Sequence, residues 1–304
     1  MAPSTRRTYT TGERRYLAFC AVCHSDPLPA TDLTLSCFAA HMAGRVKPGT
    51  VRVYLAAVRN LHLDLGLPDP TANSTLLHRV TKGIHRAHGP AAGRPRLPII
   101  VDILHKLARA LLGSDTNIVD RLMLHAAILL AFHGCLRGAE FTAPTPFDHR
   151  RHASRGDISI NLDGMQFHLK SSKADQLCKG TTIHIGRCKP PLCAVAALNA
   201  YLNVTAGGPQ DPLFRFRNGK SLSKEDFTRE VRHLLRAAHV DNASNYSGHS
   251  FRIGAATTAA MAGVPDWQVR AMGRWKSDSV LRYIRYDEAA MKTLAKRLTS
   301  SVNT

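Results

Sequence analysis

The chain has 304 residues, a length typical of about two domains, and its 44% of apolar residues is ordinary for globular cores. Lysine and arginine number 41 against 22 aspartates and glutamates, giving a formal net charge of +19, which favours a polyanion such as nucleic acid as partner. No apolar run reaches the ~20 residues that span a membrane, and the N-terminus lacks a secretory signal, so we expect an intracellular protein without a membrane partner.

Seven cysteines, an odd number, are most simply reduced thiols in such a chain. The segment Cys20-Ala-Val-Cys23-His24 matches a haem-attachment pattern, and Cys20, Cys23, Cys37 and His41 are spaced loosely like zinc ligands. However, Tyr16, Phe19, Cys20 and Cys23 share one face of a helix, and apolar residues around Cys37 share another. We therefore predict core packing, with no metal and no cofactor.

Residues 1–88 are expected to form consecutive amphipathic helices that bind DNA. The third begins near 48–50, with an inner stripe of Val51, Tyr54, Leu55, Val58, Leu61, His62 and Leu65. The fourth, over about 74–88, has an apolar line of Leu77, Val80 and Ile84. Two basic patches are candidates for DNA phosphate contact, although either could be a solvated surface: Arg79, Lys82 and Arg86, and more weakly Lys47, Thr50, Arg52 and Arg59.

Residues 89–98 hold three prolines and two glycines and cannot continue a helix. Because the segment also carries Arg94 and Arg96, we interpret it as a basic linker that lies along the DNA backbone. It divides the chain into an N-terminal helical domain (1–88) and a second domain (99–304), which would close around a duplex as a clamp.

The second domain opens with predicted helices over 101–112 and 118–133. Strand patterns follow at 157–160, 165–171 and 181–185, and helices dominate from 191 onward. The fold class is therefore mainly α, with a small three-stranded antiparallel sheet. Ser221-Leu222-Ser223-Lys224 mimics the SxxK pattern of serine hydrolases, but Ser223 stands where a helix N-cap is expected.

A set of residues in the second domain suits the attack of a tyrosine on a DNA phosphate. His249 and Arg252 form an HxxR pattern, and Trp275 and Tyr283 follow 23 and 31 residues after that arginine. Arg137 belongs to an upstream Leu-Arg-Gly-Ala-Glu segment, and a lysine, Lys173, lies in an expected turn. Two guanidiniums offer forked donors to the non-bridging oxygens of a phosphodiester, which gain charge in the transition state.

These motifs resemble those of the tyrosine recombinase (phage integrase) family, and the similarity covers nearly the whole chain. HxxR alone is weakly specific, but HxxR, the later tryptophan, a Tyr-Ile-Arg and the distant LRxxE form a specific combination. The segment from Tyr246 to Arg285 is most similar to recombinases of DIRS and Ngaro retrotransposons.

The resemblance implies that Tyr283, rather than Tyr286, is the nucleophile and forms a covalent 3′-phosphotyrosyl intermediate. Arg137 and Arg252 would hold the phosphate oxygens, and Glu140 would support Arg137. A phenol has a pKa of about 10, so the site has to favour its deprotonation during the reaction.

His249 would accept or relay the tyrosine proton. Lys173 is the expected general acid for the departing 5′ oxygen, with Lys170 and Lys179 as rivals on the same hairpin. Trp275 would donate its indole N–H to the phosphate in the position where the family carries His or Trp. Trp275 lies eight residues before the tyrosine and Arg274 nine, the more usual spacing, so either could fill this position.

The resemblance thus predicts a site-specific recombinase for mobile-element integration, acting in the nucleus on double-stranded DNA. It would act as a tetramer on two DNA sites, with exchange of a C-terminal helix that carries Met291, Leu294, Ala295 and Leu298. No paired carboxylates for metal ions and no P-loop are found, so neither metal nor ATP is expected. The alternatives are a type IB topoisomerase-like enzyme and a domesticated DNA-binding protein without cleavage activity.

Overall fold

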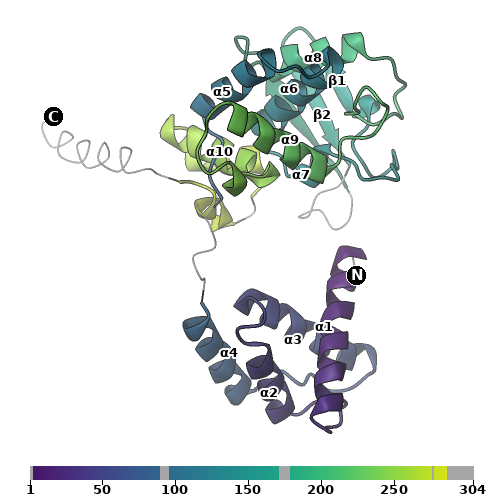
Figure 1. Cartoon of the computed structure of the whole chain (residues 1–304), viewed down its shortest axis with the longest axis vertical. Coiled ribbons are helices and arrows are strands. Elements are labelled where there is room, and N and C mark those ends of the chain that lie inside the picture. Colours follow the sequence, from purple (N-terminus) through teal and green to yellow (C-terminus); the bar gives the residue numbers. More distant parts are fainter. Residues whose placement is uncertain (1–2, 90–95, 171–178, 276, 286–304) are drawn as a thin grey trace, which may run out of the picture. The chain divides into compact units, whose positions relative to one another are not determined.

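The computed structural model describes residues 3–89, 96–170, 179–275 and 277–285. The chain forms two compact units, Met1–Arg94 and Pro95–Thr304 (Figure 1). Most of the expected linker lies outside the described residues, as do Arg94, Lys173, Tyr286 and the expected C-terminal helix. Each unit is described by itself.

The described part of the first unit is helical, as the sequence predicts. Its helices are α1 (Pro3–Val22), α2 (Asp32–Met42), α3 (Pro48–Asp64) and α4 (Thr75–Ala87). Helix α1 packs mainly on α3, and α2 packs mainly on α4. Tyr16 and Phe38 meet edge to face at the centre of this core, with ring centroids 5.3 Å apart.

Two details of the first unit differ from the expected helical faces. Leu65 is exposed rather than on the inner stripe, because α3 ends at Asp64 and the chain turns through Gly66. Cys20 is buried as predicted, but Cys23 and Cys37 are exposed. Among the described residues, no group of three or more His, Cys, Asp or Glu side chains could hold a metal ion.

Helix α6 is the centre of the second unit. Its elements before the sheet are α5 (Val101–Leu112), α6 (Ile118–His133), the short α7 (Gly138–Phe141) and a 3-10 turn, η1 (Arg155–Asp157). Helix α6 is apolar on most of its surface and packs against α8 (Ala194–Val204) and α10 (Gly248–Met261). Because α6 is buried on several sides, the position of its C-terminal end is fixed. From there the chain continues into Arg137 and α7.

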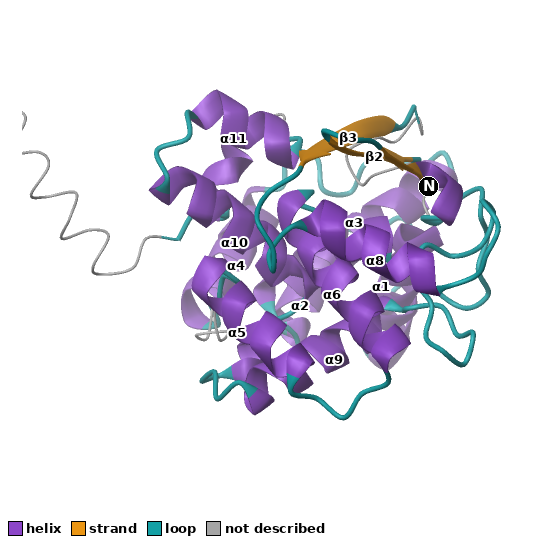
Figure 2. Cartoon of the chain, turned by 90° about the horizontal axis from the view of Figure 1, so that it is seen from above, coloured by secondary structure: helices purple, strands orange, loops and turns teal. Residues whose placement is uncertain are grey.

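The expected small sheet is present at the side of this helical core (Figure 2). Strands β1 (Ile158–Ile160), β2 (Gly164–Leu169) and β3 (Thr181–Gly186) pair antiparallel in the order β1-β2-β3. Phe167 faces Ile158 on one side and Ile183 on the other, and alternate side chains of β2 are buried against the helices. The residues between β2 and β3 that include Lys173 are not described.

The C-terminal half of the second unit presents the HxxR segment on a helix. Its remaining elements are α9 (Lys224–Ala237), η2 (Ala243–Asn245), α11 (Asp266–Gly273) and η3 (Asp278–Arg282). Ser223 caps α9, since its hydroxyl accepts from the Asp226 N–H at 3.0 Å, as predicted. Ser247 caps α10 in the same way and places His249 in the first turn. Within the described residues, no helix combines the length and apolarity needed to cross a membrane.

Candidate active site

Helix α10 places Arg252 in the interior of the second unit. The side chain has no exposed surface, and its hydrogen-bond partners among the described residues are backbone carbonyls rather than a carboxylate. One terminal nitrogen donates to the carbonyl of Cys135 at 2.5 Å, and the other donates to the carbonyl of Gly273. Burial lowers the pKa of Arg252, but an arginine still keeps its proton in a protein. A buried positive charge is therefore fixed at this point.

Tyr283 lies beside this guanidinium. The centroid of its ring is 5.4 Å from the guanidinium carbon of Arg252 and 5.1 Å from the centroid of the His249 ring. The backbone around the tyrosine is fastened to α10, because the Thr257 hydroxyl donates to the Tyr283 carbonyl at 3.2 Å and accepts from the Arg285 N–H at 3.0 Å. One helix thus carries the histidine, the arginine and the anchor of the tyrosine segment.

Trp275 completes this group. The guanidinium carbon of Arg252 lies 4.2 Å from the centroid of the Trp275 ring, a cation–π contact, and the ring centroids of Trp275 and Tyr283 are 4.9 Å apart. The indole folds back over Gly273, where an added Cβ would lie 1.7 Å from a ring carbon. Between the two expected candidates, it is therefore Trp275, not Arg274, that contacts the tyrosine and Arg252.

The segment after α6 supplies the second predicted arginine. Arg137 donates from its guanidinium to Glu140 at 2.8 Å, and its backbone N–H donates to the other carboxylate oxygen at 2.9 Å. Glu140 also accepts from Arg274 at 2.9 Å. The positive charges of Arg137 and Arg274 both contribute to lowering the pKa of Arg252, after burial. Glu140 joins Arg137 to Arg274, and Arg274 and Arg252 both donate to the carbonyl of Cys135, so the three arginines are linked through shared acceptors.

His249 is neutral at pH 7 in this setting. Burial, and then the charges of Arg96, Arg252, Arg137 and Lys224, lower its pKa to about 4. A neutral imidazole has one nitrogen free to accept a proton, which is the state that a base for the tyrosine requires. Arg96, which was expected only as a DNA contact of the linker, thus also acts on the site.

Several buried donors near Arg252 have no acceptor. Among the described residues, none accepts from Nε of Arg252, Nε of Arg274 or Nε1 of Trp275, although all three atoms are buried. Buried N–H groups are nearly always paired in folded proteins. These three groups lie on residues that contact one another or share the Cys135 carbonyl, so unpaired donors are clustered around Arg252.

Of the three lysines on the hairpin, Lys170 is held in a structural network. Its ammonium donates to Asp157 at 2.5 Å, to the Ser154 hydroxyl at 2.9 Å and to the His152 carbonyl at 3.0 Å. All three of its protons are therefore engaged, which disfavours it as a proton donor to DNA. Lys173 lies outside the described residues and stays a prediction.

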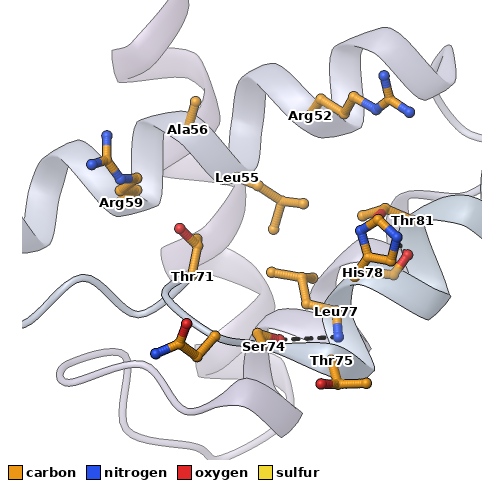
Figure 3. A pocket seen from close by; sticks show the side chains of 11 residues that line it. Arg52, Leu55, Ala56, Arg59, Thr71, Ser74, Thr75, Leu77, His78 and Thr81 are labelled. Atoms are coloured by element: carbon orange, nitrogen blue, oxygen red, sulfur yellow. Dashed lines mark hydrogen bonds between the residues drawn. The ribbon is translucent and has the colours of Figure 1, made fainter.

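The expected DNA-contacting side chains of the first unit lie at its surface. Arg79, Lys82 and Arg86 are exposed on α4. Arg52 and Arg59 line a hollow between α3 and α4 whose apolar lining includes Leu55 and Leu77 (Figure 3).

Two other residues of the weaker patch, Lys47 and Thr50, line a second hollow beside the end of α4. Arg59 donates to Asp69 at 2.5 Å, so a phosphate would have to compete with this ion pair. Arg52 makes no such ion pair among those found in the described residues and is the freer contact.

Three contributors to the site carried no signal in the sequence. Thr257 lies five residues after Arg252, off the one-turn spacing that marked His249. Lys224 was noticed only as part of a false SxxK pattern, yet its charge acts on His249. The pairing of Arg274 with Glu140 joins residues 134 apart. Each depends on how the helices pack, which a linear pattern does not record.

The fold is that of the tyrosine recombinases. A DNA-bound XerH site-specific recombinase in a pre-cleavage complex matches 95% of this chain and 78% of its own with a TM-score of 0.62 at 13% identity. A lambda integrase dimer bound to a core site matches 95% and 92%, with a TM-score of 0.61 at 14% identity. The Tn1549 transposon integrase matches 89% and 86%, with a TM-score of 0.56 at 13% identity.

No family model matches the sequence. A curated protein does: an integrase/recombinase of Selenomonas ruminantium, described as an XerD homolog, is 26% identical over 294 residues, which are 93% of this chain and 82% of that protein. The chain is thus similar to this integrase/recombinase over most of the length of both proteins, and it shares the fold of the recombinases above.

Proposed function

We propose that the protein is a site-specific DNA recombinase that cleaves and rejoins strands through a covalent 3′-phosphotyrosyl intermediate. One observation carries the proposal: the Tyr283 ring lies among His249, Trp275 and Arg252, at 5.1, 4.9 and 5.4 Å. A nucleophile, a neutral base and a fixed positive charge are thereby brought together by segments up to 34 residues apart.

The chemistry follows from these neighbours. The phenolic oxygen of Tyr283 forms a bond to the scissile phosphorus, and the bond from phosphorus to the 5′ oxygen breaks. The tyrosine proton passes to His249, while the 5′ oxygen takes a proton from a general acid, for which Lys173 is proposed. Arg137, Arg252 and the unsatisfied donors around them stabilise the charge that develops on the non-bridging oxygens. Religation is the same step in reverse, so the phosphotyrosyl bond conserves the energy of the broken one.

The unbound site is closed. Arg252 has no exposed surface, and the rings of Trp275 and Tyr283 lie against it. A phosphate can reach this guanidinium only when at least one ring moves aside. DNA binding therefore has to supply the free energy that displaces the tyrosine from its resting place, which couples cleavage to a bound substrate.

We also propose the substrate, the biological role and the assembly of the protein. Double-stranded DNA as substrate is supported by the +19 charge and by DNA-bound structural neighbours such as XerH and lambda integrase. The likeness to a transposon integrase supports a role in mobile-element integration, and the DIRS and Ngaro resemblance of residues 246–285 favours elements of that kind, acting in the nucleus. A tetramer on two DNA sites, with exchange of the C-terminal helix, is the proposed assembly.

The test is a suicide substrate. Binding selection on random duplexes would first supply a site, which is then nicked beside the scissile phosphate so that the freed strand is lost and the adduct persists. The wild-type protein should form a covalent adduct at Tyr283, mapped by peptide sequencing, and Tyr283→Phe should form none. Tyr286→Phe is the matched control and should retain the adduct.

Other outcomes separate the alternatives. Relaxation of supercoiled DNA by monomers, without joining two sites, would favour a topoisomerase. Tight, specific binding with no adduct would favour a DNA-binding protein that has lost cleavage. Deletion of residues 287–304 should reduce multimers on DNA if the C-terminal helix is exchanged, and unchanged multimers would refute the exchange.

A further inference from the structure

Arg274 has an unusual setting for a residue at the end of an exposed helix. It follows α11 in the left-handed conformation, with φ of 57°, and its side chain is turned inward, with 17% of its surface exposed. One terminal nitrogen donates to Glu140 at 2.9 Å, and the other donates to the carbonyl of Gly134 at 3.0 Å. The neighbouring Trp275 covers Arg252, so Arg274 joins the tryptophan side of the site to the segment that carries Arg137.

Glu140 accepts hydrogen bonds from both Arg137 and Arg274. Its carboxylate is nearly buried, with 4% of the side chain exposed. One oxygen accepts from the Arg137 guanidinium, while the other accepts from the Arg137 backbone N–H and from Arg274. Arg137 therefore gives Glu140 a single guanidinium hydrogen bond, which leaves the rest of its fork for another acceptor.

From this arrangement we infer that Arg274 is a positioning residue for Arg137, acting through Glu140. By occupying the second carboxylate oxygen, Arg274 prevents Glu140 from taking two guanidinium N–H groups of Arg137 in the bidentate geometry that such pairs favour. The fork of Arg137 thus stays free for a DNA phosphate. The inference deepens the proposed function and rests on it.

Removal of Arg274 has a specific consequence. Without Arg274, this oxygen of Glu140 would keep only the backbone N–H of Arg137 and could accept a second guanidinium N–H from that residue, in competition with the phosphate. The defect should then depend on the charge of Glu140, so that neutralising the carboxylate relieves it. A role confined to holding the fold together is distinguished by thermal melting, because the slower reaction of Arg274→Ala would then be accompanied by a lower melting temperature.

The experiment uses the full chain and the nicked duplex selected for the wild-type protein. Single-turnover adduct formation at saturating protein, DNA affinity and thermal melting are measured for Arg274→Ala, Arg274→Lys, Glu140→Gln and the Arg274→Ala/Glu140→Gln double variant. Arg270→Ala is the matched control, because Arg270 lies on α11, four residues before Arg274, and pairs only with Asp266 and Asp278 at the surface among the ion pairs found.

Arg274→Ala should slow adduct formation about 100-fold, the order expected for misplacing a catalytic group, with DNA affinity within about three-fold of wild type. The double variant should form adduct faster than Arg274→Ala alone. Arg274→Lys, which keeps the charge beside Glu140, should recover part of the rate, and Arg270→Ala should match wild type.

The inference is overturned if Arg274→Ala forms adduct at the wild-type rate, or if its slower adduct formation is explained by weaker DNA binding or a lower melting temperature. It is also overturned if the double variant forms adduct more slowly than Arg274→Ala alone. These results leave the proposed function intact, because the wild-type adduct is still seen. A wild-type protein that forms no adduct would instead overturn the proposed function, and this inference with it.

Discussion

The guanidinium carbon of Arg252 lies 4.2 Å from the centroid of the Trp275 ring. This contact both shields the charge and fixes the ring that packs against Tyr283. The same two residues therefore contribute to stability and to the geometry of the site, and substitution of the tryptophan should separate these contributions.

Trp275→Ala should lower the free energy of unfolding by about 3–5 kcal/mol, since it removes a buried indole. Adduct formation should fall about 100-fold, because neither Arg252 nor Tyr283 is then held in place. Trp275→Phe keeps an aromatic face but loses the indole N–H, so it should restore most of the stability and less of the rate. Equal recovery of both would show that the N–H has no part in the reaction.

Gly254 sets the approach of α10 to the chain entering the second unit. A Cβ at this position would lie 1.8 Å from the carbonyl oxygen of Ile99. That backbone cannot simply move aside, because the Ile99 N–H donates to the Ser250 carbonyl at 3.0 Å. Gly254→Ala should therefore displace α10 and cost about 1–3 kcal/mol or more, measured by urea unfolding.

Gly83, in the interior of exposed helix α4, is the matched control for this substitution. A Cβ there meets nothing within 4 Å. Gly83→Ala should stabilise the protein by about 1 kcal/mol, the difference in helix propensity. The opposite signs of the two alanine substitutions are the prediction, and destabilisation by both, or by neither, would contradict the packing described for α10.

His249 predicts a pH dependence of stability. Its pKa is lowered to about 4 by burial and by the charges of Arg96, Arg252, Arg137 and Lys224, whereas an unfolded histidine titrates near 6.5. Below pH ~6.5 the unfolded chain binds a proton that the folded ring refuses. The contribution of this group is therefore complete above ~6.5 and is lost as the pH falls toward 4, by up to about 3 kcal/mol.

The measurement is urea unfolding of wild type and His249→Asn between pH 4.5 and 8. The difference between their stabilities isolates this histidine from the other 15 of the 16 in the chain. The variant should lose less stability on acidification than wild type. Parallel curves would mean that His249 titrates alike in the folded and unfolded chains, which would also remove the argument for a neutral base at the site.

The sequence predicted those features that depend on local periodicity. The one-turn spacing of His249 and Arg252, the apolar pattern of 118–133 and the alternation in the strands each reappear in the structure, because helix and strand geometry alone fixes which side chains share a face. The prediction that Leu65 lies on the inner stripe was wrong, because α3 ends one residue earlier and helical periodicity no longer applies there.

Contacts between distant segments were predicted only as far as the family resemblance carried them. The grouping of Tyr283 with Arg252 was expected from it, but nothing in the sequence indicated that Arg274 would pair with Glu140. That pairing depends on the left-handed turn after α11, which puts Arg274 inside and Trp275 over Arg252. Non-glycine residues seldom adopt this left-handed conformation, and the periodicity of apolar residues in the sequence does not indicate where it occurs.

The choice of general acid gives the last prediction. Lys170 donates to three acceptors and is bound to Asp157, so Lys170→Met should reduce stability by about 3–5 kcal/mol through an unpaired buried carboxylate. Lys173→Met should abolish most adduct formation, since the departing 5′ oxygen then lacks a proton.

A substrate with sulfur in place of the bridging 5′ oxygen distinguishes a proton donor from a phosphate ligand. A thiolate leaves without protonation because its conjugate acid has a far lower pKa than an alcohol. If Lys173 is the acid, the sulfur substrate should restore Lys173→Met close to the wild-type rate, while Arg137→Ala should stay slow on both substrates. Persistent slowness of Lys173→Met with sulfur would assign this lysine to phosphate binding, and the proton would have to come from another residue of the hairpin.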